Sequence, residues 1–357
     1  MHRFRTRVPA AALLVGVAIC LLPVSAVAAP ADAAPAERAN RAADWEVTQL
    51  RDGRINNVQF DFTDWGLTID TYFALVAAGN RPAEAGDVIS TVSDNVREYV
   101  SDSGDFFAGP VAKSLLARRV AGLDASVESA NLNLRRKLTS LVAPTGRAKD
   151  SGAADFSNTI SQSFAALALA RSGELPDKVA TYLLRQQCNR GYFRLGMSNR
   201  ECGRGAGEAD VDATAYALQA LVMARSEGVD LPAGAVQATE QWLAGAQRDN
   251  GAFSGAGPTK GSNSNSTGLA AQALKLVGRD AAVREAANWV EDLQLTRADA
   301  AGTPARRDLG AIAYDPAHFE LALQDGIDET TRDTWRRSTP QAVLAFVPKP
   351  LTTLSAS

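Results

Sequence analysis

The sequence predicts an all-α protein built from repeated helical units, in which Ala-rich helices alternate with amphipathic ones. The chain has 357 residues, 46% of them hydrophobic and 22% charged, which is typical of a globular domain. Apolar positions recur at helical spacing, and alternating runs of β-branched and aromatic residues are missing. Segments also repeat along the chain, which indicates stacked supersecondary units that cannot bury their apolar faces alone.

The N-terminus has the three-part layout of a secretory signal peptide spanning residues 1–28. Three arginines within the first seven residues precede the apolar run Ala10–Leu22, and Ala26–Ala28 fits an A-x-A cleavage site. The alternative is an uncleaved membrane anchor, because Ala10–Ala29 has about 20 residues, roughly the length that spans a bilayer. Pro23 and the small residues after it favour cleavage, so we expect an exported protein without stable membrane insertion.

Two kinds of helical segment alternate after an Ala/Pro-rich leader of residues 29–41, which is expected to be flexible. Those rich in small residues are Gly66–Ala78, Gly109–Val120, Asn158–Arg171, Asp212–Ala224, Asn265–Val277 and Thr339–Val347. Those that are amphipathic and more charged are Asp44–Arg51, Ala83–Val100, Ala125–Val142, Pro176–Cys188, Ala233–Arg248 and Asp280–Leu295. The sequence therefore predicts one domain over residues 42–347, with a short C-terminal tail of residues 348–357.

The small-residue helices begin with a shared pattern. Asp210–Ala215 overlays Asn263–Gly268, each followed by an Ala- and Leu-rich run, at an offset of 53 residues. A third copy starts at Asp64 and a looser fourth at Asn158. Their Ala, Gly and Ser content would let helices approach closely, as the crowded inner layer of a ring requires.

The amphipathic helices end in a second repeat, in which an aromatic residue is followed by Gln, Gly and an apolar residue at fixed spacing. The copies are Trp242-Gln247-Gly251-Phe253, Tyr182-Gln187-Gly191-Phe193, Trp289-Gln294-Gly310-Ile312 with an insertion, and a worn Trp45-Gln49-Gly53-Ile55. The aromatic residue would anchor the helix, and Gln would bond backbone groups past its end. Gly would supply the left-handed helix cap, and the apolar residue after it would pack against the turn.

This second repeat resembles the QW motif of triterpene cyclases, with Phe in place of the final Trp. The paired inner and outer helices resemble the (α/α)6 toroid shared by squalene–hopene cyclases, protein prenyltransferase β-subunits and cobalamin carriers of the intrinsic-factor type. The resemblance covers most of residues 44–347 and implies this toroid as the fold.

The resemblance also suggests one catalytic residue. Class II terpene cyclases protonate their substrate with the middle Asp of a D-x-D-D motif, and Asp210-Val211-Asp212-Ala213 looks like that motif with Ala replacing the last Asp. Asp212 would then be the acid and Asp210 its partner. The alternative is that Asp212 caps its own helix, since its sister position is Asn265 and Asn caps as well as Asp but cannot donate a proton as an acid.

Other chemistries lack their residues. Outside the predicted signal peptide the chain has one histidine, His318, and two cysteines, too few for the zinc site of prenyltransferases, and no DDxxD cluster is present. We therefore expect no metal and no cofactor. Cys188 and Cys202 are expected to form a disulfide in an oxidising compartment, the alternative being a nucleophilic cysteine. The balance of 37 Lys and Arg against 40 Asp and Glu gives no support for nucleic-acid binding.

We expect a ligand site at the mouth where the inner helices begin, because polar and aromatic residues gather there around a small-residue core. Besides Asp210 and Asp212, the candidates are Asp64, Trp65, Asp70, Tyr72, Asn158, Gln162, Asn263 and Asn265. The long irregular segment of residues 295–329 is a candidate lid or partner surface.

The leading functional hypothesis is a non-enzymatic, exported module that binds a small hydrophobic or amphipathic ligand, for example an isoprenoid, or a surface partner. A divergent class II-type cyclase with Asp212 as proton donor and a structural cell-surface scaffold are the alternatives.

Overall fold

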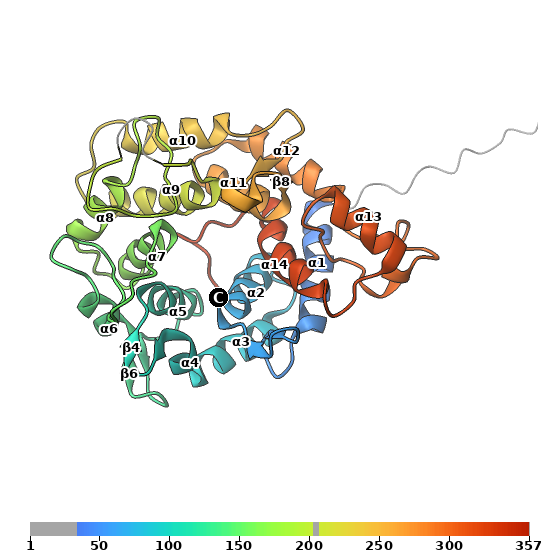
Figure 1. Cartoon of the computed structure of the whole chain (residues 1–357), viewed down its shortest axis with the longest axis horizontal. Coiled ribbons are helices and arrows are strands. Elements are labelled where there is room, and N and C mark those ends of the chain that lie inside the picture. Colours follow the sequence, from blue (N-terminus) through green and yellow to red (C-terminus); the bar gives the residue numbers. More distant parts are fainter. Residues whose placement is uncertain (1–33, 203–206, 357) are drawn as a thin grey trace, which may run out of the picture. The chain divides into compact units, whose positions relative to one another are not determined.

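The computed structural model describes residues 34–202 and 207–356, so the predicted signal peptide lies outside the described residues. Six helices in this part of the chain form an inner ring (Figure 1). They are α2 (Trp65–Ala78), α5 (Ala108–Val120), α7 (Thr159–Ala170), α9 (Val211–Ser226), α11 (Ser264–Leu276) and α14 (Arg332–Ala342), the last extended by η3 (Val343–Ala345). Each contacts the next, and α14 contacts α2, which closes the ring.

A second layer surrounds this ring and confirms the predicted all-α toroid (Figure 1). Its helices are α1 (Pro35–Gln49), α3 (Pro82–Asp94) with α4 (Val96–Val100), α6 (Leu134–Ser140), α8 (Asp177–Leu184), α10 (Ala235–Gly245) and α12 (Asp280–Glu291). In the described residues four short antiparallel hairpins accompany them: β1 (Asn56–Asn57) with β2 (Phe62–Thr63), β3 (Ser101–Asp102) with β4 (Asp105–Phe106), β5 (Ser126–Val127) with β6 (Leu132–Asn133), and β7 (Phe253–Ser254) with β8 (Ser262–Asn263).

Small residues let the inner helices touch. A Cβ added to Gly268 of α11 would lie 1.9 Å from the carbonyl oxygen of Gln341 in α14, so only glycine allows this approach. The inner helices are buried on nearly all sides, as expected for the central layer of a toroid. Among the described residues, no helix combines the length and the apolarity that crossing a bilayer requires.

The predicted outer-helix repeat links neighbouring outer helices. Gln187 Nε2 donates to the Ala235 carbonyl at the start of α10 (2.7 Å), and Gln247 Nε2 to the Ala282 carbonyl in α12 (2.8 Å). Gln294 Nε2 donates to the Arg38 carbonyl in α1 (2.9 Å), which joins the last repeat to the first. In three of its four copies the motif therefore links one outer helix to the next, and in two of these Gln also bonds the carbonyl of its own Gly.

Several boundaries differ from the sequence-based expectation. Helix α1 already begins at Pro35, inside the predicted flexible leader, because Arg38 and Ala39 pack into the core. The segment expected to be one helix over residues 125–142 forms the β5–β6 hairpin first, with Asn131 at φ +45°, and only then α6.

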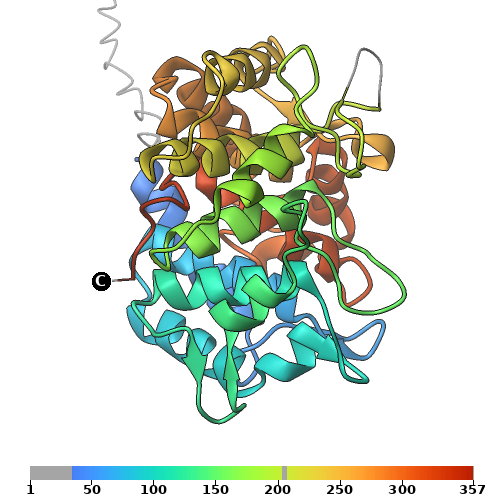
Figure 2. The ribbon, with the colours of Figure 1, turned by 90° about the vertical axis from the view of Figure 1, so that its left-hand side faces the viewer.

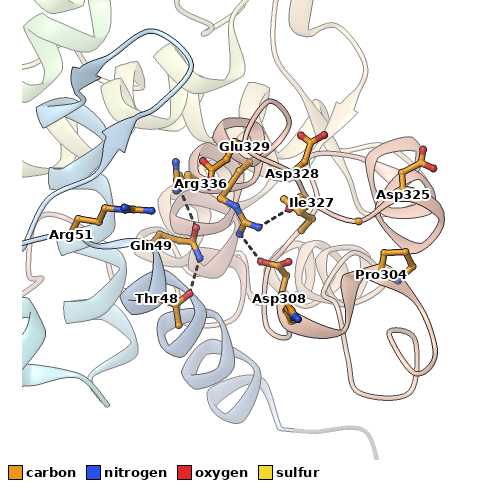
Figure 3. A pocket seen from close by; sticks show the side chains of 13 residues that line it. Thr48, Gln49, Arg51, Pro304, Asp308, Asp325, Ile327, Asp328, Glu329 and Arg336 are labelled. Atoms are coloured by element: carbon orange, nitrogen blue, oxygen red, sulfur yellow. Dashed lines mark hydrogen bonds and ion pairs between the residues drawn. The ribbon is translucent and has the colours of Figure 1, made fainter.

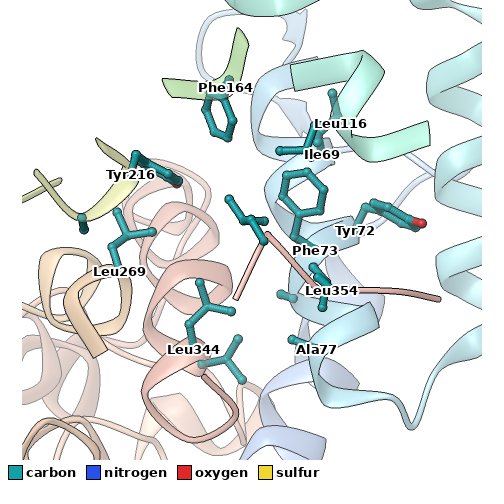
Figure 4. Packing of buried hydrophobic residues seen from close by; sticks show 14 of the residues in the cluster. Ile69, Tyr72, Phe73, Ala77, Leu116, Phe164, Tyr216, Leu269, Leu344 and Leu354 are labelled. Atoms are coloured by element: carbon teal, nitrogen blue, oxygen red, sulfur yellow. The ribbon is translucent and has the colours of Figure 1, made fainter. Parts of the chain in front are cut away.

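Two further segments contain structure that the sequence did not predict. The insertion of residues 295–329 contains η2 (Pro304–Arg307) and α13 (Pro316–Asp325). Outside the insertion, the short 3-10 helix η1 (Gly257–Thr259) lies between β7 and β8. The tail of residues 348–356 enters the ring from the side opposite the long loop that precedes α7 (Figure 2). Leu351 and Leu354 are buried there, with Leu354 beside Phe73 and Ala77 (Figure 4).

A disulfide joins Cys188 and Cys202, whose Cα atoms are 4.5 Å apart. This is the predicted pairing. It ties the end of the α8 region to the loop that leads toward α9, in a small buried cluster with Tyr192.

Candidate functional site

The inner helices begin with a repeated cap. The side chains of Asp64, Asn158, Asp210 and Asn263 each accept a hydrogen bond from the backbone N–H three residues later, at 2.8 to 3.0 Å. These bonds satisfy donors that a helix start leaves open. The cap of α9 is therefore Asp210, and the expectation that Asp212 caps this helix is wrong.

Asp212 lies in the first turn of α9, two residues past the cap. Its side chain is partly buried, and its Oδ1 is fully buried with no hydrogen-bond partner among the described residues. Burial and the nearby Asp210 charge raise the pKa of Asp212 to about 6, while the Ser266 hydroxyl of α11 opposes the rise. Burial likewise raises the pKa of Asp210, and its backbone hydrogen bonds counteract this. Asp212 thus carries a proton at mildly acidic pH.

Charged and aromatic side chains of α2, α5, α7 and α9 contact one another in a row along the inner ring, starting near Asp212. Asp70 of α2 forms an ion pair with Lys113 Nζ of α5 (2.7 Å), and this ammonium lies 5.7 Å from the ring centre of Phe164 in α7. Phe164 packs against Tyr216 of α9 with ring centres 4.8 Å apart. Burial and the charges of Asp70 and Asp212 hold the pKa of Tyr216 well above its usual value, so its hydroxyl stays protonated.

Two further pairs complete the circle at the mouth. Arg337 of α14 forms an ion pair with Asp64 Oδ2 (2.6 Å), and its carbonyl accepts from Asn265 Nδ2 (2.8 Å). In Figure 4 the side chains of Phe164 and Tyr216 point toward the interior of the ring, where Ile69 and Leu269 also lie. The mouth thus combines polar groups from α2, α5, α9, α11 and α14 with an apolar, aromatic interior.

Some predicted site residues have other surroundings. Gln162 is fully buried and bonds the Gly146 and Val179 carbonyls and the Ala148 N–H, so its amide serves the framework. Tyr72 lies in the middle of α2 and lines a pocket at the opposite face, not the mouth. Trp65 is buried at the start of α2 and donates to Glu98 Oε2 (3.3 Å).

The sequence-based reasoning missed Lys113, Phe164, Tyr216, Ser266 and Arg337. Lys113 had a usable signal, because a lysine inside an Ala-rich helix of a buried layer needs an anionic partner. The others had none, since Phe164, Tyr216 and Ser266 meet only when neighbouring inner helices pack together, and Arg337 meets Asp64 only when the ring closes.

The insertion of residues 295–329 builds an open pocket of about 460 Å³ against α1 and α14 (Figure 3). Arg332 pairs there with Asp308 (2.6 Å), and Arg336 donates to Gln49 Oε1 (3.2 Å). The first contact fastens the insertion to α14, and the second joins α14 to α1. His318, on α13, pairs with Asp315 (2.7 Å) at the surface. No group of residues suited to hold a metal ion occurs in the part of the chain that the structure describes.

Comparison with solved structures identifies the architecture as the α/α toroid. A protein from Actinoplanes is 17% identical with a TM-score of 0.58, over 88% of this chain and 99% of that one. The apo type II terpene cyclase MstE from Scytonema is 13% identical with a TM-score of 0.58, over 88% and 97%. A glycosidase in complex with glucose is 13% identical with a TM-score of 0.56, over 90% and 98%. No protein-family model and no curated protein sequence matches, so these likenesses show the fold alone.

Proposed function

We propose that the chain is an exported toroid that binds a small, neutral, amphipathic ligand at the inner-helix mouth, with Asp212 as the group that bonds the ligand's polar end. The signal-peptide pattern and the disulfide support export. The single observation that carries the binding proposal is the buried, unpartnered carboxylate oxygen of Asp212. Buried polar groups are nearly always hydrogen-bonded, which supports a ligand that bonds this oxygen alongside the Ser266 hydroxyl.

The charges around the mouth favour a neutral ligand. Lys113 and Arg337 are already paired with Asp70 and Asp64, which leaves little positive charge to hold a phosphate. Protonated Asp212 can instead donate a hydrogen bond to an alcohol or carbonyl oxygen, while the apolar part of the ligand packs against Phe164 and Tyr216.

Calorimetric titration with farnesol, a neutral isoprenoid alcohol, at pH 5 and pH 8 tests this proposal. Wild-type protein is expected to bind more tightly at pH 5, because Asp212 is then protonated and donates. Asp212→Asn keeps a donor at every pH, so its affinity should not change between the two.

Asp210→Asn is the matched control. It keeps the helix cap and removes one of the charges that raise the pKa of Asp212, so the pH dependence should persist with a lower midpoint. Absence of farnesol binding at both pH values, or a pH dependence that survives in Asp212→Asn, contradicts the proposal.

Acid catalysis is the second candidate, and a specific observation favours it. The charges of Asp70, which is paired with Lys113, and of Asp212, which is protonatable, both raise the pKa of Tyr216. Such a pair can give and take protons. A carboxyl with a pKa near 6 is a weak acid for an isolated alkene and suits proton transfer to oxygen.

Mass spectrometry of product formation from isoprenoid alcohols and epoxides distinguishes catalysis from binding. A catalytic Asp212 predicts product with wild-type protein and loss of at least about 100-fold in rate with Asp212→Asn. Equal rates for both proteins would remove Asp212 as the proton donor, and absence of wild-type turnover would leave binding as the function.

A further inference from the structure

A second, apolar pocket of about 350 Å³ lies where α2 ends, at the face opposite the mouth. Leu75 and Val76 of α2, Ile89 of α3 and Leu123 after α5 form its apolar walls. Residues Lys349, Ser355 and Ala356 of the C-terminal segment form the remaining side. Its volume lies within the range of roughly 300–1,000 Å³ that is usual for small-molecule sites.

The wall of this pocket includes a buried hydroxyl without a partner. Tyr72 is 1% exposed, and its hydroxyl has no hydrogen-bond partner among the described residues. Phe73 and Leu354 pack in the ring interior, and Figure 4 shows the Tyr72 hydroxyl directed away from them. Burial raises the pKa of Tyr72, so the group remains a donor at all physiological pH values. An orphaned donor of this kind points to a ligand that carries an acceptor oxygen.

The charge at the pocket is positive. Lys349 is exposed at its edge and makes no ion pair within the described residues, and among the described residues that line the pocket none is acidic. Its ammonium lies at the end of α2, where a Cβ on Gly79 would be 3.9 Å from Nζ. Arg171, which donates to the Leu351 carbonyl (2.7 Å), adds a second positive charge close to Tyr72.

We propose that this pocket binds a small amphiphile with an apolar tail and a carboxylate head. The tail packs against Leu75, Val76 and Ile89, Lys349 pairs with the carboxylate, and the Tyr72 hydroxyl donates to a ligand oxygen. Because the C-terminal segment forms one side of the pocket, a bound ligand also holds this segment in the ring. The site is separate from the mouth and does not depend on the function proposed for Asp212.

Calorimetric titration of the full chain with nonanoate, octanol and octylamine tests the charge preference. These probes share one octyl tail and differ only in their head groups. We expect nonanoate to bind more tightly than octanol by roughly two- to fivefold, as an exposed ion pair allows, and octylamine to bind most weakly. Octylamine binding as tightly as nonanoate, or absence of binding by all three, overturns the proposal.

Variants of single residues locate the site. Lys349→Gln should weaken nonanoate binding to the level of octanol and leave octanol binding unchanged, whereas Tyr72→Phe should weaken both. Gly86 of α3 lines the pocket and has open space where a Cβ would be, so Gly86→Phe should fill the pocket and abolish binding, while Gly86→Ala retains it. Circular dichroism verifies that each variant folds. Wild-type affinity in Gly86→Phe, or an unchanged nonanoate affinity in Lys349→Gln, places the carboxylate elsewhere and overturns the assignment.

Discussion

Asp210 and Asp212 show how two carboxylates, two residues apart, acquire different roles from their positions on one helix. The cap side chain reaches the N–H three residues on, so Asp210 bonds Ala213, and its oxygen Oδ1 is satisfied. Asp212 already belongs to the helix and faces Ser266 of the neighbouring inner helix. The sequence identified both residues as notable but assigned the cap to the wrong one. The helix start, on which that choice depends, cannot be fixed to within two residues from sequence.

Replacing Asp212 with Asn is expected to stabilise the protein at neutral pH. The pKa of Asp212 is raised from 3.8 to about 6, so the folded state binds the proton more tightly than the unfolded state. Stability therefore falls as the pH rises from about 4 to 6 and stays constant above that. Removing the charge should recover roughly 1–3 kcal/mol at pH 8 and almost nothing at pH 4, with partial exposure keeping the value below the full shift.

Urea denaturation at pH 4, 6 and 8 measures this difference. Asp249→Asn, at an exposed turn after α10, is the control and should follow the wild type at each pH. If Asp212→Asn is less stable than the wild type at pH 8, the carboxylate is held by favourable interactions, and the raised pKa is contradicted.

At the level of helices and turns, the aromatic-Gln-Gly repeat was readable from the sequence because its spacing is local. What its Gln and Gly residues contact was not readable. Gln294 and its acceptor Arg38 are 256 positions apart, so only ring closure brings them together. The hairpin that replaces the start of an expected helix was missed for a related reason. Its turn depends on a positive φ at Asn131, which no sequence motif predicted.

Gly310 offers a test of the closure between the last and first repeats. Its φ is +94°, and an added Cβ would lie 2.1 Å from the Arg41 carbonyl oxygen of α1. Gly310→Ala should therefore lose about 1–2 kcal/mol for the left-handed backbone and a further amount for the clash, which forces α1 away. Gly278→Ala is the matched control, because its φ is +76° with nothing within 4 Å, so it should lose the backbone contribution alone. Thermal denaturation measures both, and equal losses would show that the contact with α1 does not tighten the ring.

The molecule as a whole is a ring that its own C-terminal segment fills from one side. The repeats predicted the two layers of helices, since each unit needs neighbours to bury its apolar face. They could not predict that residues 348–356 enter the core, because this segment lies outside every repeat. Its contacts come from several inner helices. The Gln219 Oε1 of α9 accepts from the Leu351 N–H (2.8 Å), and the Gln272 Nε2 of α11 donates to the Lys349 carbonyl (2.7 Å).

This arrangement predicts that the segment contributes to global stability. Leu354 is 1% exposed inside the ring, whereas Thr353 beside it is exposed. Leu354→Ala should cost roughly 2–5 kcal/mol, as for other buried leucines, and Thr353→Ala less than about 0.5 kcal/mol. Guanidinium denaturation followed by tryptophan fluorescence compares the two variants. If Leu354→Ala proved as stable as Thr353→Ala, the packing of this segment inside the ring would not contribute to the stability of the fold. The pocket proposed for the amphiphile, which this segment closes on one side, would then be open on that side.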